Sequence, residues 1–419
     1  MLHLLKRIVV PELKLKDDDC SLVKERVSGM GIKKIAFIQK GLVPLASGKV
    51  AQALRDRFPD FEIEIVDVAL LLKRRKLIIL INLFSIFNEY GLDILLGRKK
   101  IRDCFFRTIY IFKTIKRLVV DHLSKESYAF TFQMQSLYDA SIEGTPHFVY
   151  TDHTNLANLH YGELQKNKLY SPGWIELERR IYQNATLIFT RSNHITRSLL
   201  EQYDCPPERV VCVYAGSNVE TSRADELDNQ GYSNKNILFV GVDWERKGGP
   251  VLVEAFRKVL EIDPEASLTI VGCTPQVELP NCKVVGRVSL QEVGAYYRQA
   301  SVFCLPTILE PFGIVFVEAL SYRLPIVATD VGAIPDFVIN GVNGYLVGPA
   351  QVEPLAEHLI DLIGNPDKCR TFGERGQAIA TERYTWEKVG DRMRENIIAA
   401  IYRGEGLRAA DKERIKDGI

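Results

Sequence analysis

The sequence predicts an α/β fold with two doubly wound parallel sheets, one in each half of the chain, facing each other across a cleft. Apolar β-rich runs alternate with amphipathic helix patterns from residue 33 and again from residue 237, as in βαβ units. The chain has 419 residues, of which 46% are hydrophobic, and this length exceeds one typical core. A polar stretch with almost no apolar content, 218–236, separates the two series and is the expected linker.

The first domain is expected over 1–217. Its predicted strands are the runs at 33–41, 61–68, 147–154, 185–190 and 209–216. Helix patterns lie between them at 49–58, 173–184 and 195–203. Because strands and helices alternate, the strands are expected to be parallel, with ligands at their carboxyl ends.

The second domain is expected over 237–385. Its predicted strands are 237–241, 267–272, 283–286, 301–307 and 325–329, and its predicted helices are 249–260, 290–299, 313–322 and 354–363. A last amphipathic helix is predicted within 386–419, and we expect this C-terminal segment to return to the first domain.

A basic segment, 73–117, interrupts the alternation. It holds 12 Lys or Arg and 3 acidic residues, a local net charge of +9, interleaved with Leu, Ile and Phe. Two interpretations stay open: helices packed on a sheet with a solvated basic face, or an amphipathic surface in peripheral contact with anionic lipid. Its longest apolar run, 77–87, is predicted to be too short to span a bilayer.

Composition favours a cytoplasmic protein. The formal net charge is +1, which indicates no particular partner, and the eight cysteines are scattered without a CxxC pair, as reduced thiols would be. The N-terminal stretch has no long apolar region with a cleavage site, so no signal peptide is expected. Without G-x-G-x-x-G or a readout motif, a dinucleotide oxidoreductase and a nucleic-acid binder are both disfavoured.

The stretch "TILEPFG" predicts an anion site. Glu310 precedes Pro311, which favours extended geometry at the glutamate and a helix starting near the proline. The free N–H groups of Phe312, Gly313 and Ile314 would then face the cleft and suit a phosphate.

A second glutamate, Glu318, lies in the apolar run after this turn. Eight helical residues would separate it from Glu310 by about 12 Å, beyond the roughly 5–9.5 Å of paired glycosidase carboxylates. The two are therefore expected to accept hydrogen bonds from two ends of one long polar ligand. The alternative is a loop charge at Glu310 and an ion pair with a nearby Arg or Lys at Glu318.

Two further strand ends carry polar side chains. Lys247 lies in the turn of "FVGVDWERKGG", between a strand and a helix, where a cation can meet phosphate oxygens. Asp152 and His153 follow the strand "HFVYT" in the first half. A lone histidine is more often structural, but at a cleft-facing strand end a functional role and a structural role stay equally open.

Together these stretches resemble the retaining glycosyltransferases of family 4, which have the GT-B fold of two Rossmann-like domains. "EPFGIVFVE" resembles the family's E-x7-E signature, and "FVGVDWERKGG" resembles its phosphate-binding lysine loop. The likeness covers about residues 145–400 and is loose over 1–145.

The resemblance implies a nucleoside-diphosphate-sugar donor and gives each candidate a role. Glu310 would contact the sugar, Glu318 the ribose, and Lys247 the diphosphate, with help from the N–H groups of 312–314. His153 resembles the histidine beside the reacting sugar. The remaining implied contacts are Gly286, Arg287 and Val288 at the base, and, as weaker candidates in the loop "PLASGK", Ser47 and Gly48 near the phosphates.

One departure stands out. The family usually has an arginine where this chain has Val242, and the leaving diphosphate needs its growing charge stabilised. Arg246, directly before Lys247, is the expected replacement.

The resemblance implies a metal-independent hexosyltransferase that retains anomeric configuration, uses no cofactor, and takes a UDP-sugar in preference to a GDP-sugar. The expected acceptor is a saccharide or a lipid-linked molecule in cell-envelope polysaccharide or glycolipid synthesis, at the inner face of the membrane. Two alternatives stay open: a sugar phosphorylase or synthase of the same fold, and a catalytically silent partner subunit.

Overall fold

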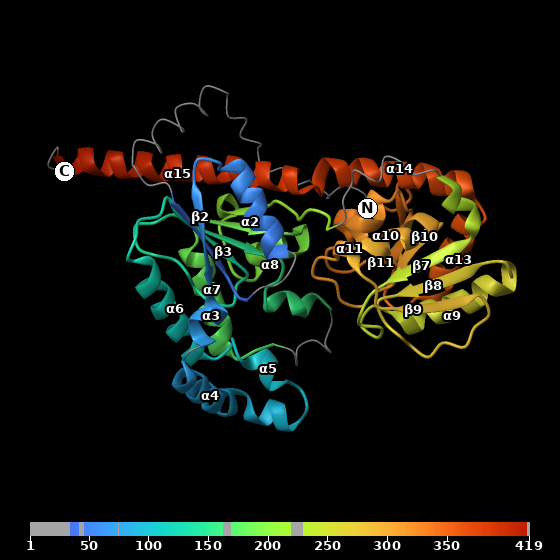
Figure 1. The fold of residues 1–419 in the computed structure, drawn as a ribbon, viewed down its shortest axis with the longest axis horizontal. Coiled ribbons are helices and arrows are strands. Elements are labelled where there is room, and N and C mark those ends of the chain that lie inside the picture. Colours follow the sequence, from blue (N-terminus) through green and yellow to red (C-terminus); the bar gives the residue numbers. More distant parts are fainter. Residues whose placement is uncertain (1–33, 42–45, 74, 162–168, 219–228, 417–419) are drawn as a thin grey trace.

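The computed structural model describes residues 34–41, 46–73, 75–161, 169–218 and 229–416. Two lobes lie side by side in Figure 1, each built on one parallel sheet of six strands. The two predicted doubly wound sheets are thereby confirmed. The centre of the predicted linker, 219–228, lies outside the described residues.

The first lobe has the strand order β2-β1-β3-β4-β5-β6, with every neighbouring pair parallel. Its strands are β1 (Lys34–Gln39), β2 (Glu62–Asp67), β3 (Phe130–Met134), β4 (His147–Thr151), β5 (Leu187–Thr190) and β6 (Val210–Cys212). Its helices are α2 (Ala46–Arg57), α3 (Val68–Lys73), α4 (Lys76–Leu95), α5 (Ile101–Cys104), α6 (Ile109–Leu123), α7 (Pro172–Asn184) and α8 (Asn193–Glu201), with the short 3-10 helices η1 (Leu156–Tyr161) and η3 (Pro207–Arg209).

The second lobe has the order β12-β11-β10-β7-β8-β9, again all parallel. Its strands are β7 (Asn236–Val240), β8 (Ser267–Val271), β9 (Cys282–Gly286), β10 (Val302–Leu305), β11 (Ile326–Thr329) and β12 (Gly344–Val347). Its helices are η5 (Asn229–Asn234), α9 (Gly249–Ile262), α10 (Leu290–Gln299), α11 (Ile314–Ser321), α12 (Ile334–Phe337), α13 (Val352–Ile363) and α14 (Pro366–Arg383), and α15 (Trp386–Lys416) follows.

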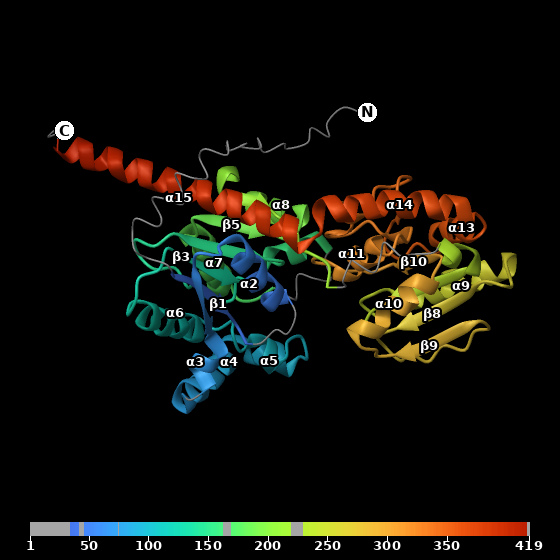
Figure 2. The ribbon, with the colours of Figure 1, turned by 45° about the horizontal axis from the view of Figure 1, so that its top comes forward.

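Helix α15 leaves the second lobe and lies along the first, as Figures 1 and 2 show. Val389, Met393 and Ile397 are fully buried in the apolar core that also contains Phe37 and Phe132 of the first sheet. At the same contact, Arg57 of α2 forms an ion pair with Asp391 at 2.5 Å. The first lobe is therefore completed by residues from the far end of the chain.

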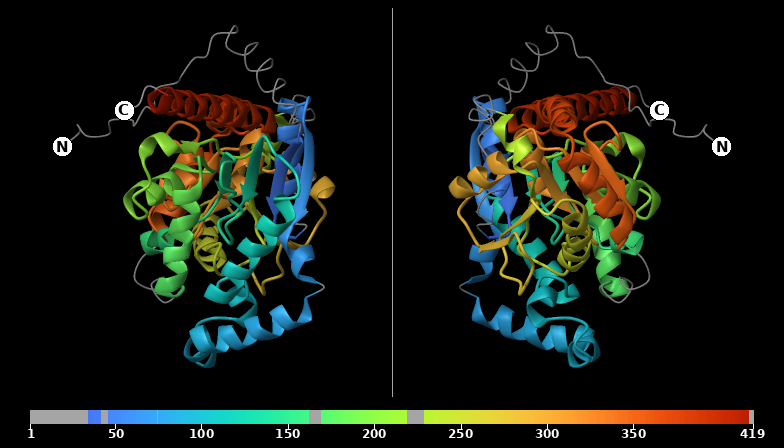
Figure 3. Two further views of the ribbon diagram at one scale, coloured as in Figure 1. Left: turned by 90° about the vertical axis from the view of Figure 1, so that its left-hand side faces the viewer. Right: turned by 90° about the vertical axis from the view of Figure 1, so that its right-hand side faces the viewer.

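Helix α4 lies at the end of the first lobe opposite α15 (Figure 3). It has 20 residues and is long and apolar enough, by length and composition alone, to cross a membrane. The run 77–87, predicted to be too short to span, lies within this longer apolar helix, which continues to Leu95. Only its inner face is covered, by burial of Asn82, Ile86 and Tyr90 against the lobe.

Candidate active site

The strand order of the second lobe defines a crevice at its carboxyl edge. The order changes direction between β7 and β10, the point where ligands bind in doubly wound sheets. The turn 241–248 follows β7, and the loop 306–313 follows β10. The two predicted motifs of this half therefore meet at one place.

Lys247 and Glu310 form a buried ion pair across this crevice, from Nζ to Oε2. Only 8% of Lys247 and 4% of Glu310 are exposed. Burial lowers the pKa of the Lys247 ammonium from its usual 10.5, and the neighbouring Glu310 carboxylate opposes that shift. Two charges held this close in a dry site are arranged to meet a polar, charged ligand.

The two loops are locked together by their backbones. The amide of Ile308 and the hydroxyl of Thr307 both donate to the carbonyl oxygen of Arg246, each at 3.0 Å. Gly248 has φ +73°, and a Cβ there would lie 1.9 Å from the carbonyl oxygen of Pro306. The close approach of Gly248 to Pro306 therefore requires glycine. It fixes the position of Lys247 relative to Glu310.

Arg246 also lies at the crevice. Its guanidinium donates to the carbonyl oxygen of Leu309 at 2.8 Å and pairs with Asp243 at 3.2 Å. The side chain is thus engaged by Asp243 and by the loop that carries Glu310, and its role toward a diphosphate stays a prediction. Val242, which takes the place of the family's usual arginine, is 66% exposed.

Helix α11 begins at Ile314, so the prediction of a start near Pro311 was wrong. The reason is Gly313, whose left-handed φ of +90° cannot belong to a right-handed helix. The free N–H groups at the helix start are consequently those from Gly313 onward, and Phe312 lies before them with its ring buried against Phe337. Their predicted contact with a phosphate stays a prediction.

Glu318 is buried inside α11 with 3% exposure. Its Oε2 accepts a hydrogen bond from the Tyr297 hydroxyl at 3.0 Å, and the described part of the chain offers it no ion pair. Burial raises the pKa of this carboxyl to about 7. The structure therefore contradicts the alternative that Glu318 forms an ion pair. Glu318 and Glu310 have separate partners, Tyr297 and Lys247.

Three further predicted contacts lie at the carboxyl end of β9. Gly286 ends the strand with φ +82°, Arg287 is exposed, and Val288 is half-buried. Their predicted contact with a nucleobase stays a prediction.

The first lobe reaches the crevice through Tyr161. Its hydroxyl donates to the carbonyl oxygen of Glu310 at 3.1 Å. Gly332, with φ +56°, makes room for this contact, because a Cβ there would lie 2.4 Å from that hydroxyl. The Tyr161 ring lies 5.3 Å from the ring of His194, which lies 5.1 Å from that of His160. Burial lowers the pKa of His194 to about 4.

Sequence reasoning did not find Tyr161 or His194. A weak signal for His194 was present, because it lies at the start of α8, the helix that follows β5. Tyr161 gave none, since it ends a 3-10 helix and reaches the other lobe only through the fold.

His153 lies in a small polar cavity of about 90 Å³, with Arg107, Gln135 and Glu178 among its walls. Its Nε2 is 3.3 Å from the amide nitrogen of Asn158, and its Nδ1 is buried without a hydrogen-bond partner among the described residues. Burial lowers the pKa of His153 to about 4, so the imidazole is neutral near pH 7. A neutral ring with one free nitrogen can bind a hydroxyl.

Glu178 holds the loop that carries His153. The carboxylate is buried and accepts hydrogen bonds from the backbone amide of Asn155 and from the hydroxyls of Ser136, Tyr182 and Tyr203. Asp152, the neighbour of His153, pairs with Arg191 at 3.4 Å. Asp152 is thus engaged within its own lobe.

Ser47 and Gly48 were predicted in a loop, and that was wrong. Both lie in the first turn of α2, which begins at Ala46. The amphipathic pattern that follows extends the helix back to this point, and 42–45 lie outside the described residues. A Cβ at Gly48 would meet no atom within 4 Å, so only a ligand could require glycine there.

No group of three His, Cys, Asp or Glu that could hold a metal ion occurs within the described ranges. Charge at the crevice comes instead from Lys247, Arg246 and the start of α11.

The two-lobed, doubly wound fold places a buried cation and carboxylate at a switch point, where ligands bind in folds of this kind. Comparison with known proteins identifies its class. The family described as Glycosyl transferases group 1 matches residues 225–379, and Glycosyltransferase Family 4 matches 94–221. An uncharacterized glycosyltransferase of Methanocaldococcus jannaschii is 30% identical over 249 residues, covering 54% of this chain and 68% of the relative.

This chain belongs to the group 1 glycosyltransferases, family 4, with the GT-B fold. A phosphatidyl-myo-inositol mannosyltransferase of Mycobacterium leprae is 33% identical over 189 residues, covering 42% of this chain and 50% of the relative. The chain thus spans half to about two thirds of the length of these curated relatives. An Anabaena HepE structure in complex with UDP has a TM-score of 0.60 at 16% identity, covering 87% of this chain and 100% of that one.

Proposed function

We propose that this glycosyltransferase moves a hexose from a UDP-sugar to a saccharide or lipid-linked acceptor with retention of anomeric configuration, in envelope polysaccharide or glycolipid synthesis. The observation that carries the proposal is the buried pair of Lys247 and Glu310 at the switch point of the second lobe. The UDP bound to the HepE relative and the mannosyl transfer in the name of the mycobacterial relative support it.

In this proposal the diphosphate lies against Lys247, Arg246 and the first N–H groups of α11. The bond between the sugar C1 and the diphosphate oxygen breaks. The positive charge of the two side chains and of the helix start stabilises the leaving oxygen. The acceptor hydroxyl attacks C1 from the same face and gives its proton to that oxygen. Glu310 accepts hydrogen bonds from the sugar, and Glu318 from the ribose. His153 binds a hydroxyl of the sugar across the cleft, and no metal ion takes part.

The test has two stages. Thermal unfolding is first measured with UDP, GDP and ADP, because a ligand that binds only the native state raises its apparent stability. We expect UDP to give the largest shift, and no shift with any of the three would contradict the donor class. The anomeric proton of the product from the matching UDP-sugar is then followed by NMR. An inverted product would contradict the mechanism, and a requirement for inorganic phosphate would favour a phosphorylase.

A further inference from the structure

The outer face of α4 is an unusual surface. Nine of the 17 exposed large hydrophobic side chains in the described chain lie between residues 77 and 101. The most exposed are Leu95 at 84%, Leu92 at 78% and Phe84 at 77%. Leu77, Leu80, Phe84, Phe87 and Leu95 recur at helical spacing along one stripe. A contiguous apolar stripe of this length indicates an interaction site.

Positive charge flanks this stripe at both ends. The exposed cations are Lys73, Arg75 and Lys76 before it, and Arg98, Lys100 and Arg102 after it. The acidic side chains beside them are fewer: Glu89 and Asp93 are half-buried, with Asp93 3.9 Å from Arg98, and Asp103 is partly exposed and pairs with Arg102 at 3.4 Å. Apolar contact in the middle with cations at the rim complements an anionic bilayer surface better than a neutral protein face.

The connections of α4 decide between lying on a bilayer and crossing it. A spanning helix would put its two ends on opposite sides of the membrane. Here the interior of the helix is bonded to one lobe, because the Asn82 amide donates to the carbonyl oxygen of Phe105 at 2.8 Å and the Tyr90 hydroxyl donates to that of Arg107. Helices α3 and α5, next to the two ends, pack against the same lobe. The helix therefore lies in the plane of the surface.

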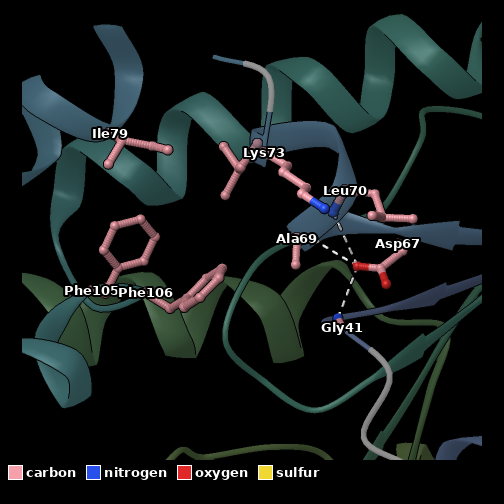
Figure 4. Close-up of a pocket in the computed structure, with 9 residues that line it drawn as sticks. Gly41, Asp67, Ala69, Leu70, Lys73, Ile79, Phe105 and Phe106 are labelled. Atoms are coloured by element: carbon pink, nitrogen blue, oxygen red, sulfur yellow. Dashed lines mark hydrogen bonds between the residues drawn. The ribbon is translucent and has the colours of Figure 1, made fainter. Parts of the chain in front are cut away.

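Directly behind α4 is an apolar cavity of about 460 Å³, shown in Figure 4. Its walls are Gly41, Asp67, Ala69, Leu70, Leu72, Lys73, Ile79, Phe105 and Phe106. It opens at the carboxyl ends of β1 and β2, where a ligand of the first lobe is expected. Oδ1 of Asp67 is occupied by the backbone amides of Gly41 and Ala69, at 2.9 and 2.8 Å.

Adjacent residues contribute to the walls of this cavity and of the cavity that contains His153. Phe106 lines the apolar cavity, and the next residue, Arg107, lines the polar cavity of His153. The ammonium of Lys40 lies 4.3 Å from the centre of the Phe106 ring. Burial and then the charge of Arg107 lower the pKa of Lys40, opposed by Asp103, so the two cations repel each other. An anionic group between them would relieve that repulsion.

We propose that the outer face of α4 lies in the surface of an anionic bilayer, and that the cavity behind it binds a membrane lipid with a phosphate-containing head group. The apolar chain fills the cavity, the phosphate meets Lys40 and Arg107, and the head group is the sugar acceptor. The assignment of this lipid as the acceptor rests on the proposed function. The binding of the lipid in the cavity and of the bilayer by α4 does not depend on the proposed function.

Vesicle flotation tests the surface. Vesicles of phosphatidylcholine alone are compared with vesicles that also contain phosphatidylglycerol. The wild type is expected to float with the anionic vesicles, and the double variant L80E/F84E is expected to lose at least about tenfold in binding. The matched control I262E/I339E changes exposed isoleucines elsewhere and should float as the wild type does. The proposal is overturned if L80E/F84E floats as well as the wild type, or if the wild type does not float at all. It is also overturned if the wild type is a dimer without lipid and L80E/F84E is a monomer.

Calorimetric titration with decyl phosphate tests the cavity. Decanol and inorganic phosphate serve as the separate halves of the same probe. We expect decyl phosphate to bind the wild type, inorganic phosphate not to displace it, and Lys40→Gln to weaken it about tenfold through loss of one charged contact. Ile79→Trp, which fills the cavity, should abolish it. Binding unaffected by both substitutions, or matched by inorganic phosphate, contradicts the site.

These outcomes separate from those of the proposed function. Failure of UDP to raise the unfolding temperature, with vesicle and decyl phosphate binding intact, removes the donor assignment alone. Transfer to a water-soluble acceptor with no vesicle or decyl phosphate binding removes the membrane proposal alone.

Discussion

At the residue scale, the crevice depends on charges that are buried and paired. Lys247 and Glu310 lost their water on folding and now compensate each other, so neither can be removed alone without leaving an unpaired charge in a dry site. A charged side chain that is held in place before a ligand binds does not have to reorient during the reaction. It can therefore stabilise a charge that develops on the ligand at lower cost.

We predict that Lys247→Met lowers the free energy of unfolding by about 3–5 kcal/mol, because Glu310 stays buried without its partner. The double variant K247M/E310Q should recover part of that loss, since no charge is left unpaired. Urea denaturation measures both. Lys258→Met, at an exposed ion pair of α9, is the control and should cost about 1 kcal/mol or less. Equal losses in the single and double variants would contradict the pairing.

Glu318 should make stability depend on pH. Its folded pKa of about 7 lies above the 4.5 of an unfolded glutamate, so the folded state binds an extra proton between these values. That stability is fully present below pH 4.5 and is lost as pH rises through 7, with a slope of up to about 1.4 kcal/mol per pH unit.

Glu318→Gln should remove that slope. The buried histidines titrate in the opposite sense at lower pH, so the informative quantity is the difference between the variant and the wild type. Glu254→Gln, on the exposed face of α9, should leave the wild-type curve unchanged. Parallel curves for wild type and Glu318→Gln from pH 5 to 8 would show that burial does not raise this pKa.

At the element scale, the start of α11 decides where the anion site lies. A Cβ at Gly313 would lie 2.7 Å from Cδ2 of Phe316 and 2.9 Å from Cγ of Glu310, in a backbone conformation that side chains disfavour. The helix, the phenylalanine and the glutamate are thus positioned by one glycine.

We predict that Gly313→Ala costs about 1–3 kcal/mol of stability and also weakens UDP binding, because the strain displaces the start of α11, whose N–H groups are proposed to meet the diphosphate. The control is Gly91→Ala in α4, where φ is not positive and space is open, so stability should rise by about 0.5–1 kcal/mol and UDP binding should not change. A Gly313→Ala protein as stable as the wild type would refute the strain argument.

Much of the element order could be predicted from the sequence, because buried parallel strands appear as apolar runs. The strand β3 could not, since it alternates phenylalanine with Thr131 and Gln133, which are buried only because they find hydrogen-bond partners inside the fold. The four-residue edge strand β12 and helix α14 were missed too. Contacts between lobes, such as that of Tyr161 with Glu310, have no local signal at all.

At the scale of the whole molecule, the first lobe depends on residues encoded after the second. Met393 of α15 is fully buried among the aromatic side chains of β1, β3 and β4. A defect in α15 should therefore destabilise the lobe that is remote from it in sequence.

Met393→Ala should lower the stability of the first lobe by about 2–5 kcal/mol through the cavity it leaves. Hydrogen exchange resolved by peptide measures this, with faster opening expected in β1 and β3. Ile262→Ala, at an exposed position, is the control and should change little. Faster exchange confined to the second lobe would contradict the assignment.

The chain passes between the lobes at two places, after β6 and before α15, and these two passages touch. The amide of Ser217 donates to the carbonyl oxygen of Tyr384 at 3.0 Å, and the Trp386 indole donates back to that of Ser217 at 3.0 Å. Gly216 lets the indole approach, since a Cβ there would lie 2.5 Å from it. The two crossings are thus bonded to each other at one joint, so a substitution that breaks either hydrogen bond is expected to loosen the connection between the lobes.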